Sequence, residues 1–498
     1  MKIKDLSPDL ILSNGRVYTM DSDGDVVEAV AAKDGRVLAT GGDAEIQALA
    51  GPGTKQIDLA GRAVIPGIFD SHNHLLEVGA KLSQIRLDEC ESQEEMMELV
   101  RERAEVTPPG EWIIGEGWNE NNFEDGRLPT RHDIDPATNQ HPVILKRFFN
   151  MDVVNGAALE LAGVDANTPD PEGGRIEHDT DGQPNGILRA AAKLFVRDLL
   201  PLPSMDELVE AIRLACREMN SFGITSVIDP GLMPYEVEAY QAAYDAGVLS
   251  VRTNMMLSWH GFRDEETEEQ LDSRALETGL RTGLGDEWLR LGGLKMAIDG
   301  GTSSHTAYMY EPFEGEDEVR NYNRLNPEQL RRYFCTAQEH GWDVGIHTCG
   351  DRAMDMVVEA FADVIQAYPN PDARHNVIHA YFPSDNALAL MQKYNIGAVI
   401  QPTFLYHEGD MIFRDVGQER AANYKPARKF LDRGIPMAAN SDIPSTVSVN
   451  PFPALYALVT RRNNVGNLVA PDQAVSREEA LRAYTIDGTW LTREESLK

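Results

Sequence analysis

The segment IPGIFDSHNHL, residues 65–75, joins an apolar run to a polar stretch that contains two histidines. His72 and His74 lie two positions apart, so on an extended chain their side chains point to the same side. Two such imidazoles pack poorly at the end of a buried strand, but they can bind a metal ion. The segment therefore predicts a buried strand that leads into a metal site.

Seven more short apolar runs follow, and amphipathic segments of helix length separate most of them. The eight runs span residues 64–70, 223–230, 250–257, 291–300, 343–350, 376–380, 396–402 and 435–442. Two of the amphipathic segments, 204–223 and 326–341, end in glycine, which is typical of a helix C-terminus. The alternation predicts an α/β fold. Eight such units favour a (β/α)8 TIM barrel, and a doubly wound parallel sheet is the alternative.

The rest of the chain predicts additions to this barrel. Residues 1–64 contain short strands separated by Asn-Gly and Asp-Gly turns, which indicates a small N-terminal β unit. The barrel is expected over residues 65–445, with an insertion at about 88–190 that has strands of its own. A long loop after a barrel strand commonly recognises substrate. Residues 446–498 are expected to form a C-terminal helical segment.

Polar side chains recur where the predicted strands end. They belong to strands one, four, five, six and eight: His72, His74, Lys295, His347, His379 and Asp442. The carboxyl ends of barrel strands converge on one mouth, so these side chains are expected to meet there. Together they suit one or two zinc-like ions.

Each of these residues has an alternative interpretation when it is taken alone. His379 could be a core histidine, and Asp442 could be a turn or helix-capping residue. Lys295 differs, because a lysine inside a barrel strand must be paired or modified to be tolerated there. The shared placement of all six at strand ends favours the metal site.

Sequence motifs along nearly the whole chain match one known family in order and spacing. They include GIFDSHNHL, GWNENNFEDGRLPTRHDID, GITSVIDPG, LKMAIDGGTSSHTA, GIHTCGDRAMD, VIHA and NSDIPS. The chain resembles the amidohydrolase superfamily, and within it the YtcJ-like branch, which includes N-substituted formamide deformylase-like enzymes. The resemblance implies a TIM barrel with a small β-sandwich built from both chain ends. That family usually continues past TREESLK with two more sandwich strands, so the C-terminal part is expected to be truncated here.

The resemblance also implies roles for the strand-end residues. His72 and His74 would bind the more buried of two divalent ions, with zinc as the expected metal, and His347 and His379 the more exposed one. Lys295 would be carbamylated by CO2 and bridge both ions. Asp442 would contact the buried ion and shuttle protons. We therefore expect catalytic roles for Asp442, Lys295 and His379.

Three positions depart from the family pattern. Asn150 and His305 replace a usual histidine and a usual arginine, and Ala190 stands at a usually acidic position. All three are expected on the substrate side of the site. They therefore affect the prediction of the substrate and not the prediction of the metal ligands. The candidate substrate-binding residues are Trp118, Asn150, Arg189, His305 and Tyr308.

The leading function is a metal-dependent hydrolase that cleaves an amide C–N bond of a small molecule. A deaminase of the same superfamily is an alternative, although HTCGD, residues 347–351, lacks the glutamate that follows the strand-five histidine in deaminases. An ester or lactone hydrolase or a decarboxylase on the same scaffold is a further alternative. The last is a non-catalytic barrel protein, which would be expected to have lost ligands.

Composition narrows the partners of this 498-residue chain. Its formal charge of −34 argues against nucleic acid and anionic membranes as partners. No apolar run of about 18 residues predicts a membrane span, and the N-terminus lacks a secretory signal pattern. Four scattered cysteines are typical of free thiols in a reducing compartment. We therefore expect a cytoplasmic enzyme, with a homodimer as one possible assembly.

Overall fold

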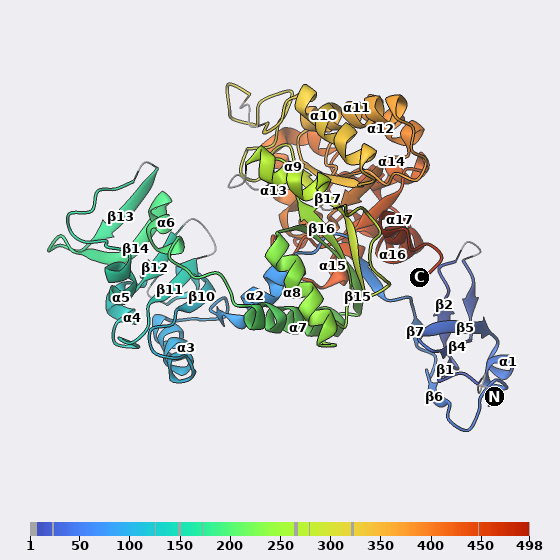
Figure 1. Ribbon diagram of the computed structural model, residues 1–498, viewed down its shortest axis with the longest axis horizontal. Helices are drawn as coiled ribbons and strands as arrows, with labels where there is room; N and C mark the ends of the chain where they lie inside the picture. Colours follow the sequence, from blue (N-terminus) through green and yellow to red (C-terminus); the bar gives the residue numbers. More distant parts are fainter. Residues whose placement is uncertain are drawn as a thin grey trace. The chain divides into compact units, whose positions relative to one another are not determined.

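The computed structural model describes residues 7–497 except 22–23, 125, 148–150, 172, 263–266, 278, 320–322 and 447 (Figure 1). The chain forms two compact units. The first comprises Met1–His74 and Arg217–Lys498, and the second comprises Leu75–Cys216. None of the described helices combines the length and the apolar character needed to cross a membrane.

An eight-stranded parallel sheet forms the centre of the first unit. Its strands, in sequence order, are β8 (Ile68–Asp70), β15 (Ile224–Leu232), β16 (Arg252–Ser258), β17 (Leu289–Ala297), β18 (Val344–Thr348), β19 (Asn376–His379), β20 (Gly397–Ile400) and β21 (Met437–Ala439). Each strand pairs with the next in sequence order, whereas a doubly wound sheet reverses its order at a switch point. The predicted α/β barrel is therefore confirmed, and the doubly wound alternative is wrong.

The two edges of this sheet meet just beyond the first and last strands. The backbone N–H and the hydroxyl of Ser71 both donate to the carbonyl oxygen of Ala439, at 3.4 and 3.0 Å. Inside the barrel, an apolar layer takes residues from most of the strands: Phe69, Ile228, Met256, Ile378, Val399 and Ala438. This layer fills the barrel below the carboxyl ends of the strands, where the polar residues lie.

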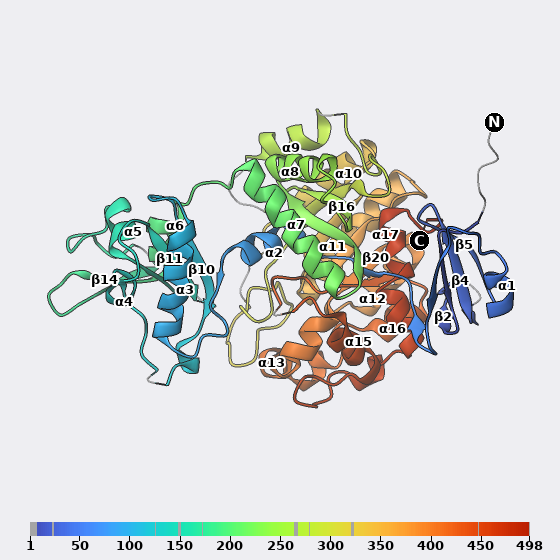
Figure 2. The ribbon, with the colours of Figure 1, turned by 90° about the horizontal axis from the view of Figure 1, so that it is seen from below.

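Helices follow the strands around the barrel (Figures 1 and 2). They include α8 (Pro234–Asp245), α9 (Glu268–Leu276), α10 (Pro327–Glu339), α11 (Asp351–Ala367), α12 (Asp385–Tyr394), α13 (Pro402–Ala421) and α14 (Ala427–Asp432). Helix α10 shows why they form where they do. Asn326 caps its N-terminus by accepting from two backbone N–H groups, Pro327 opens its first turn, and its apolar face is buried. Phe334 of α10 stacks on Phe361 of α11 with ring centroids 3.9 Å apart.

Both ends of the chain belong to the first unit. Near the N-terminus, a four-stranded sheet contains β1 (Leu10–Ser13), β4 (Ala29–Lys33), β5 (Arg36–Gly41) and β6 (Lys55–Asp58), and a three-stranded sheet contains β2 (Arg16–Tyr18), β3 (Val26–Val27) and β7 (Ala63–Val64). The β4–β5 hairpin turns at Asp34-Gly35, where both residues have positive φ, as a type I′ turn requires. After residue 446 the chain forms α15 (Pro451–Thr460), α16 (Arg477–Ala483) and α17 (Thr489–Thr492).

The second unit is built on a six-stranded mixed sheet. Its strands are β9 (Ile85–Arg86), β10 (Ile113–Trp118), β11 (Val143–Arg147), β12 (Met151–Val154), β13 (Gly174–His178) and β14 (Pro184–Ala190). Its helices are α2 (Leu75–Ser83), α3 (Gln93–Val106), α4 (Arg131–Ile134), α5 (Gly156–Leu161), α6 (Leu194–Arg197) and the first part of α7 (Met205–Ser221). The predicted insertion at about 88–190 falls inside this unit.

Both faces of this second sheet are buried. Along β11, Val143 and Leu145 belong to the apolar cluster on one face, whereas Ile144 belongs to the cluster on the other. This alternation follows from the two-residue period of a strand.

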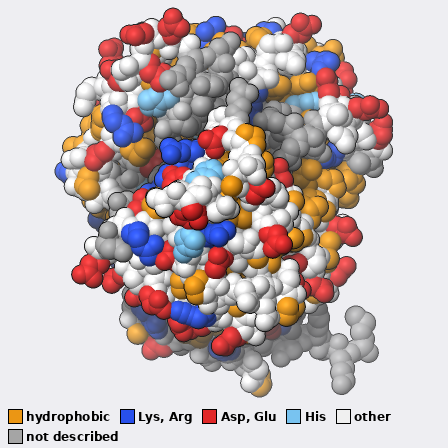
Figure 3. Space-filling view, turned by 90° about the vertical axis from the view of Figure 1, so that its left-hand side faces the viewer, with side chains coloured by type: hydrophobic (Ala, Val, Ile, Leu, Met, Phe, Trp, Pro, Cys, Tyr) orange, Lys and Arg blue, Asp and Glu red, His pale blue; other side chains and the backbone are white. Residues whose placement is uncertain are grey.

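On the side of the molecule drawn in Figure 3, acidic and basic side chains intermingle on the surface.

Candidate metal centre

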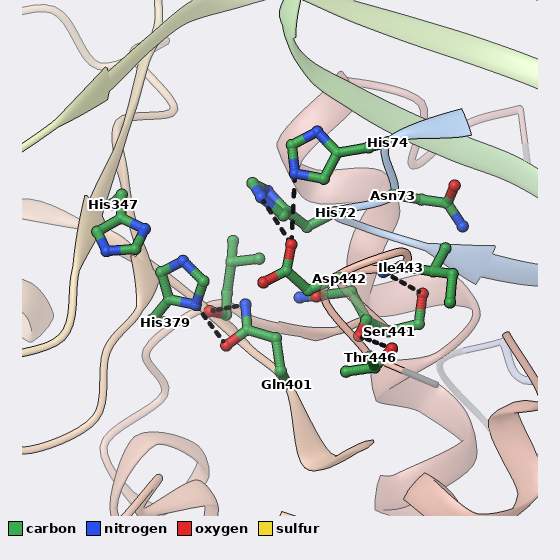
Figure 4. A network of polar contacts seen from close by, with 12 residues as sticks. His72, Asn73, His74, His347, His379, Gln401, Ser441, Asp442, Ile443 and Thr446 are labelled. Atoms are coloured by element: carbon green, nitrogen blue, oxygen red, sulfur yellow. Dashed lines mark hydrogen bonds and ion pairs between the residues drawn. The ribbon is translucent and has the colours of Figure 1, made fainter. Parts of the chain in front are cut away.

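Two histidines and one aspartate converge where the first and last barrel strands end (Figure 4). The Nε2 atoms of His72 and His74 lie 3.5 and 3.4 Å from Oδ1 of Asp442. Backbone hydrogen bonds hold these segments together: Asp442 N–H donates to the His72 carbonyl, and His74 N–H donates to the Ile443 carbonyl, both at 3.0 Å. The predicted pair of histidines therefore faces the predicted carboxylate.

Two further histidines approach this group from neighbouring strands. The rings of His347 on β18 and His379 on β19 have centroids 4.2 Å apart, and His379 lies 5.9 Å from His72. Potential ligand atoms of His72, His379 and Asp442 lie within 4.8 Å of one another, and so do those of His347, Cys349 and His379. His379 thus belongs to both sets.

Lys295 on β17 is 1% exposed. Among the described residues its ammonium has no hydrogen-bond acceptor, and it lies 5.3 Å from the centre of the Phe262 ring. Burial lowers the pKa of Lys295 to about 7, although the negative charge of Asp442 opposes the shift. A buried cation with so few partners is unusual, and the neutral amine is the form that can react further.

The donor set fits a zinc-like ion. Burial, followed by the positive charge of Lys295, lowers the pKa of His72 and holds that of His347 near 4. Burial also lowers the pKa of His379. Neutral imidazoles keep the lone pair that a metal ligand needs. In addition, the buried Nδ1 of His72 has no hydrogen-bond partner among the described residues.

Two further buried aspartates, Asp70 and Asp299, hold backbone segments next to the candidate metal ligands. Asp70, the last residue of β8, accepts hydrogen bonds from Ser441 and Asn73. Asp299 accepts backbone N–H bonds from Tyr308, Cys349 and Gly350 at 2.7–3.0 Å. Burial raises the pKa of Asp70 to about 6 and that of Asp299 to about 7. The only sequence signal was a carboxylate at the end of an apolar run.

The predicted substrate residues of the barrel unit lie in the segment after β17. Tyr308 is buried, and the Arg352 guanidinium lies 4.6 Å from its ring centre. His305 stacks on Phe313, and its Nδ1 lies 3.0 Å from Oε1 of Glu316. Both side chains therefore have partners within the segment or the helix that follows β18.

The other predicted substrate residues belong to the second unit. Trp118 is completely buried in the core of its sheet, where Nε1 donates to the Leu145 carbonyl at 2.9 Å. Arg189 pairs with Glu177 on the neighbouring strand at 2.5 Å. Asn150 lies outside the described residues. Trp118 and Arg189 thus contribute to the packing and pairing of their own sheet.

Comparison with known sequences gives one family and several relatives. The pattern of the Amidohydrolase family matches residues 55–498. Protein LONG AFTER FAR-RED 3 of Arabidopsis thaliana is 31% identical over 97% of this chain and 84% of its own length. The putative amidohydrolase YtcJ of Bacillus subtilis (strain 168) is 29% identical, over 95% and 88%. The N-substituted formamide deformylase of Arthrobacter pascens is 27% identical, over 96% and 88%.

A solved structure shares the fold over almost the full length. It is an uncharacterized metal-dependent hydrolase from Pyrococcus furiosus, which is 26% identical with a TM-score of 0.79. The match covers 98% of this chain and 95% of that one. The resemblance stated from the sequence motifs is therefore confirmed.

Proposed function

This chain belongs to the amidohydrolase family, and from that premise we propose that it is a metal-dependent hydrolase that cleaves an amide C–N bond of a small molecule. The observation that carries the proposal is the convergence of His72 and His74 on Asp442, with His347 and His379 beside them. The relative named as a formamide deformylase and the structural relative titled a metal-dependent hydrolase support the choice of reaction.

We assign the ligands of two divalent ions, with zinc as the expected metal. His72, His74 and Asp442 would hold one ion, and His347 and His379 would hold the other. When bound, such ions lower the pKa of water towards neutrality and polarise a substrate carbonyl. The lowered pKa values of His72, His347 and His379 and the carboxylate of Asp442 suit this role, because nitrogen and carboxylate ligands are those that zinc prefers.

Lys295 is proposed to carry a carbamate that supplies oxygen ligands to both ions. Its neutral amine would add to CO2, forming an N–C bond and releasing one proton. The product would replace a buried amine that has no hydrogen-bond acceptor among the described residues with a carboxylate-like group that can act as a metal ligand. An unmodified ammonium has no lone pair and could not ligate a metal.

Asp442 is proposed to transfer the proton during hydrolysis. Its carboxylate would take a proton from the attacking water as the O–C bond forms, and deliver it to the amine nitrogen as the C–N bond breaks. The backbone of Asp442 is held in a left-handed conformation, with φ of 54°, by the hydrogen bond to the His72 carbonyl. This fixed backbone keeps the carboxylate at the strand ends.

The test begins with the metal content of protein purified without added metal or chelator. We expect about two zinc-like ions per chain, the stoichiometry of a two-metal site. A panel of amides, esters, lactones and amino-substituted rings is then assayed for released amine, acid, ammonia and CO2. We expect amine release by the wild type and by the surface control Asp432→Asn, and loss of about a hundredfold or more in Asp442→Asn.

Other outcomes select among the alternatives. Ammonia release from the rings would indicate a deaminase, acid without amine an ester or lactone hydrolase, and CO2 a decarboxylase. Failure to take up zinc, even with added metal and bicarbonate, would overturn the metal-dependent mechanism and leave a barrel protein without catalysis.

A further inference from the structure

A second fully buried lysine lies beside the metal centre, and the proposed mechanism does not use it. Lys425 is 1% exposed, and aromatic rings surround its ammonium. The Nζ atom lies 3.7 Å from the centre of the Tyr381 ring, 5.2 Å from that of Tyr424 and 5.3 Å from that of Phe404. Such faces attract a cation, but they leave its N–H groups without an oxygen acceptor. The acceptor must come from elsewhere.

Gln401 supplies that acceptor and also contacts a metal-site histidine. Its Oε1 atom lies 3.0 Å from Nζ of Lys425 and 3.0 Å from Nδ1 of His379. Gln401 is 0% exposed, so the two contacts form in the protein interior. Figure 4 shows Gln401 facing the His379 ring. One amide oxygen therefore connects the second lysine to His379, a proposed metal ligand.

The chemistry of these three groups fixes the direction of both hydrogen bonds. A lysine ammonium has three donors and no acceptor, so Gln401 must present its oxygen, not its NH2 group, to Nζ. The same oxygen can only accept from His379, which requires a proton on Nδ1. A neutral imidazole with Nδ1 protonated has its lone pair on Nε2. The ring nitrogen that remains free to bind a metal is thereby selected.

The backbone around Lys425 is built to hold the side chain in this place. Lys425 has a left-handed conformation, with φ of 47°, which is costly for a residue other than glycine. Its backbone N–H donates to the carbonyl of Tyr381 at 2.9 Å, and Tyr381 lies two residues after His379 in the sequence. Its own carbonyl accepts from the buried Arg461 guanidinium at 3.3 Å. An unfavourable backbone conformation and two buried basic side chains therefore occur together here.

We propose that Lys425 is a positioning residue for the metal centre: through Gln401 it holds His379 in the Nδ1-protonated form, so that Nε2 is available as a metal ligand. This inference rests on the proposed function in that it takes His379 as a ligand. Hydrogen bonds that orient ligating histidines commonly change metal affinity by about ten- to a hundredfold.

The protonation state of Lys425 does not change which atom of Gln401 accepts the two hydrogen bonds. Burial lowers the pKa of Lys425 well below its ordinary value, while the charges of Asp442 and Glu408 oppose this shift. A neutral amine has a lone pair as well as two N–H donors, but Nε2 of Gln401 donates to the Val399 carbonyl at 3.5 Å, so Oε1 remains the atom that faces Lys425 and His379. The proposal therefore stands on the placement of the three groups.

The test compares Lys425→Met, which removes the donor but fits an aromatic cage, with Lys393→Met. Lys393 also lies over a tyrosine ring, 4.7 Å from the centre of Tyr394, but it is exposed on α12. Zinc affinity is measured by chelator competition on the full-length protein. We expect Lys425→Met to bind zinc about ten- to a hundredfold more weakly and Lys393→Met to match the wild type.

A double-mutant cycle and a direct spectroscopic readout separate positioning from a general structural effect. In Gln401→Leu, adding Lys425→Met should cause no further loss, because Lys425 acts through Gln401. Nitrogen NMR of metal-free, 15N-histidine-labelled protein reports which ring nitrogen of His379 carries the proton, with His379→Asn identifying its signals. We expect Nδ1 protonation in the wild type and a mixture in Lys425→Met. The melting temperature of Lys425→Met should be unchanged or higher than that of the wild type, because a buried basic group is removed.

An unchanged His379 tautomer and zinc affinity in Lys425→Met, or losses that add to those of Gln401→Leu, would overturn the proposal. If Lys425→Met does not fold, Gln401→Leu decides by the same two measurements. Absence of zinc binding by the wild type would defeat the proposed function, whereas the tautomer of His379 in the metal-free protein would still test whether Lys425 acts through Gln401.

Discussion

Oδ2 of Asp70, at the end of the first barrel strand, accepts a 2.5 Å hydrogen bond from the hydroxyl of Ser441, just beyond the last strand. Oδ1 of the same carboxylate accepts from the Ser441 N–H at 3.0 Å. Both residues are buried, and each is adjacent to, or two positions from, a proposed ligand, His72 or Asp442. This contact therefore sets the distance between the two sides of the candidate metal centre.

Replacing Asp70 with asparagine should weaken both the fold and the centre. The carboxylate accepts three hydrogen bonds from Ser441 and Asn73, and an amide NH2 would oppose one or more of these donors. We expect a loss of about 1–3 kcal/mol in the free energy of unfolding and weaker zinc binding. Urea titration and chelator competition measure the two effects, with Asp432→Asn as the surface control. Unchanged values would show that Asp70 does not hold the ligands.

His375 should make the stability depend on pH. Its Nδ1 accepts the Val344 N–H at 3.1 Å, and its Nε2 donates to Gln338 at 3.0 Å, so the ring is held neutral. Burial lowers its pKa to about 4. The unfolded chain takes up this proton near pH 6.5, whereas the folded chain does so only near pH 4. The neutral His375 therefore contributes its full share to the free energy of unfolding above about pH 6.5. As the pH falls towards 4, this contribution is lost and the free energy of unfolding decreases by about 3 kcal/mol.

Urea titrations of metal-free protein between pH 4 and 7.5 measure this effect. The curve of His375→Gln should fall less steeply with decreasing pH than that of the wild type. The exposed His340→Gln serves as the matched control and should follow the wild type. Parallel curves for wild type and His375→Gln would contradict the prediction.

The N-terminus of α10 offers a local test of helix capping. Asn326 accepts from the N–H groups of Glu328 and Gln329 at 3.0 and 2.9 Å. Asn326→Ala leaves both donors without this acceptor and should destabilise the helix by about 1 kcal/mol, whereas Asn326→Ser should retain most of the stability. Hydrogen exchange of the amides in the first turn of α10 gives the readout. Equal protection in both variants would argue against the cap.

A buried ion pair makes the second unit separately testable. Asp152 is 0% exposed, and it accepts two hydrogen bonds from the Arg197 guanidinium, at 2.6 and 2.8 Å. Asp152→Ala should cost about 1–3 kcal/mol, less than for a fully buried pair because Arg197 is partly exposed. Limited proteolysis should then cleave within residues 75–216 first, while the exposed Asp198→Ala behaves as wild type. First cleavage elsewhere would contradict this prediction.

The eight barrel strands were predictable because each is a short apolar run, and strands buried on both sides need little else to be recognised. The grouping of His72, His347 and Asp442 followed from topology, since the carboxyl ends of barrel strands meet. For these residues the position along the strand was sufficient information.

Residues whose roles depend on a distant partner could not be predicted. Nothing next to Lys425 in the sequence indicates that its amine meets Gln401, 24 positions earlier. Asp70 likewise depends on Ser441, which is 371 positions away. The pairing of Arg189 with Glu177 depends in the same way on the register of two neighbouring strands. Side-chain partners of this kind follow from register and packing, which a linear pattern does not specify.

The order in which the chain is synthesised gives the junction of β8 and β21 a particular consequence. His72 emerges from the ribosome early, whereas Asp442 follows only after all eight strands have been made. Until then the proposed ligand set is incomplete, and the two ends of a long loop must meet before it can form, at an entropic cost that grows slowly with loop length. Capture of metal would therefore be among the last events of biogenesis, and it would favour only those chains whose ring is already closed.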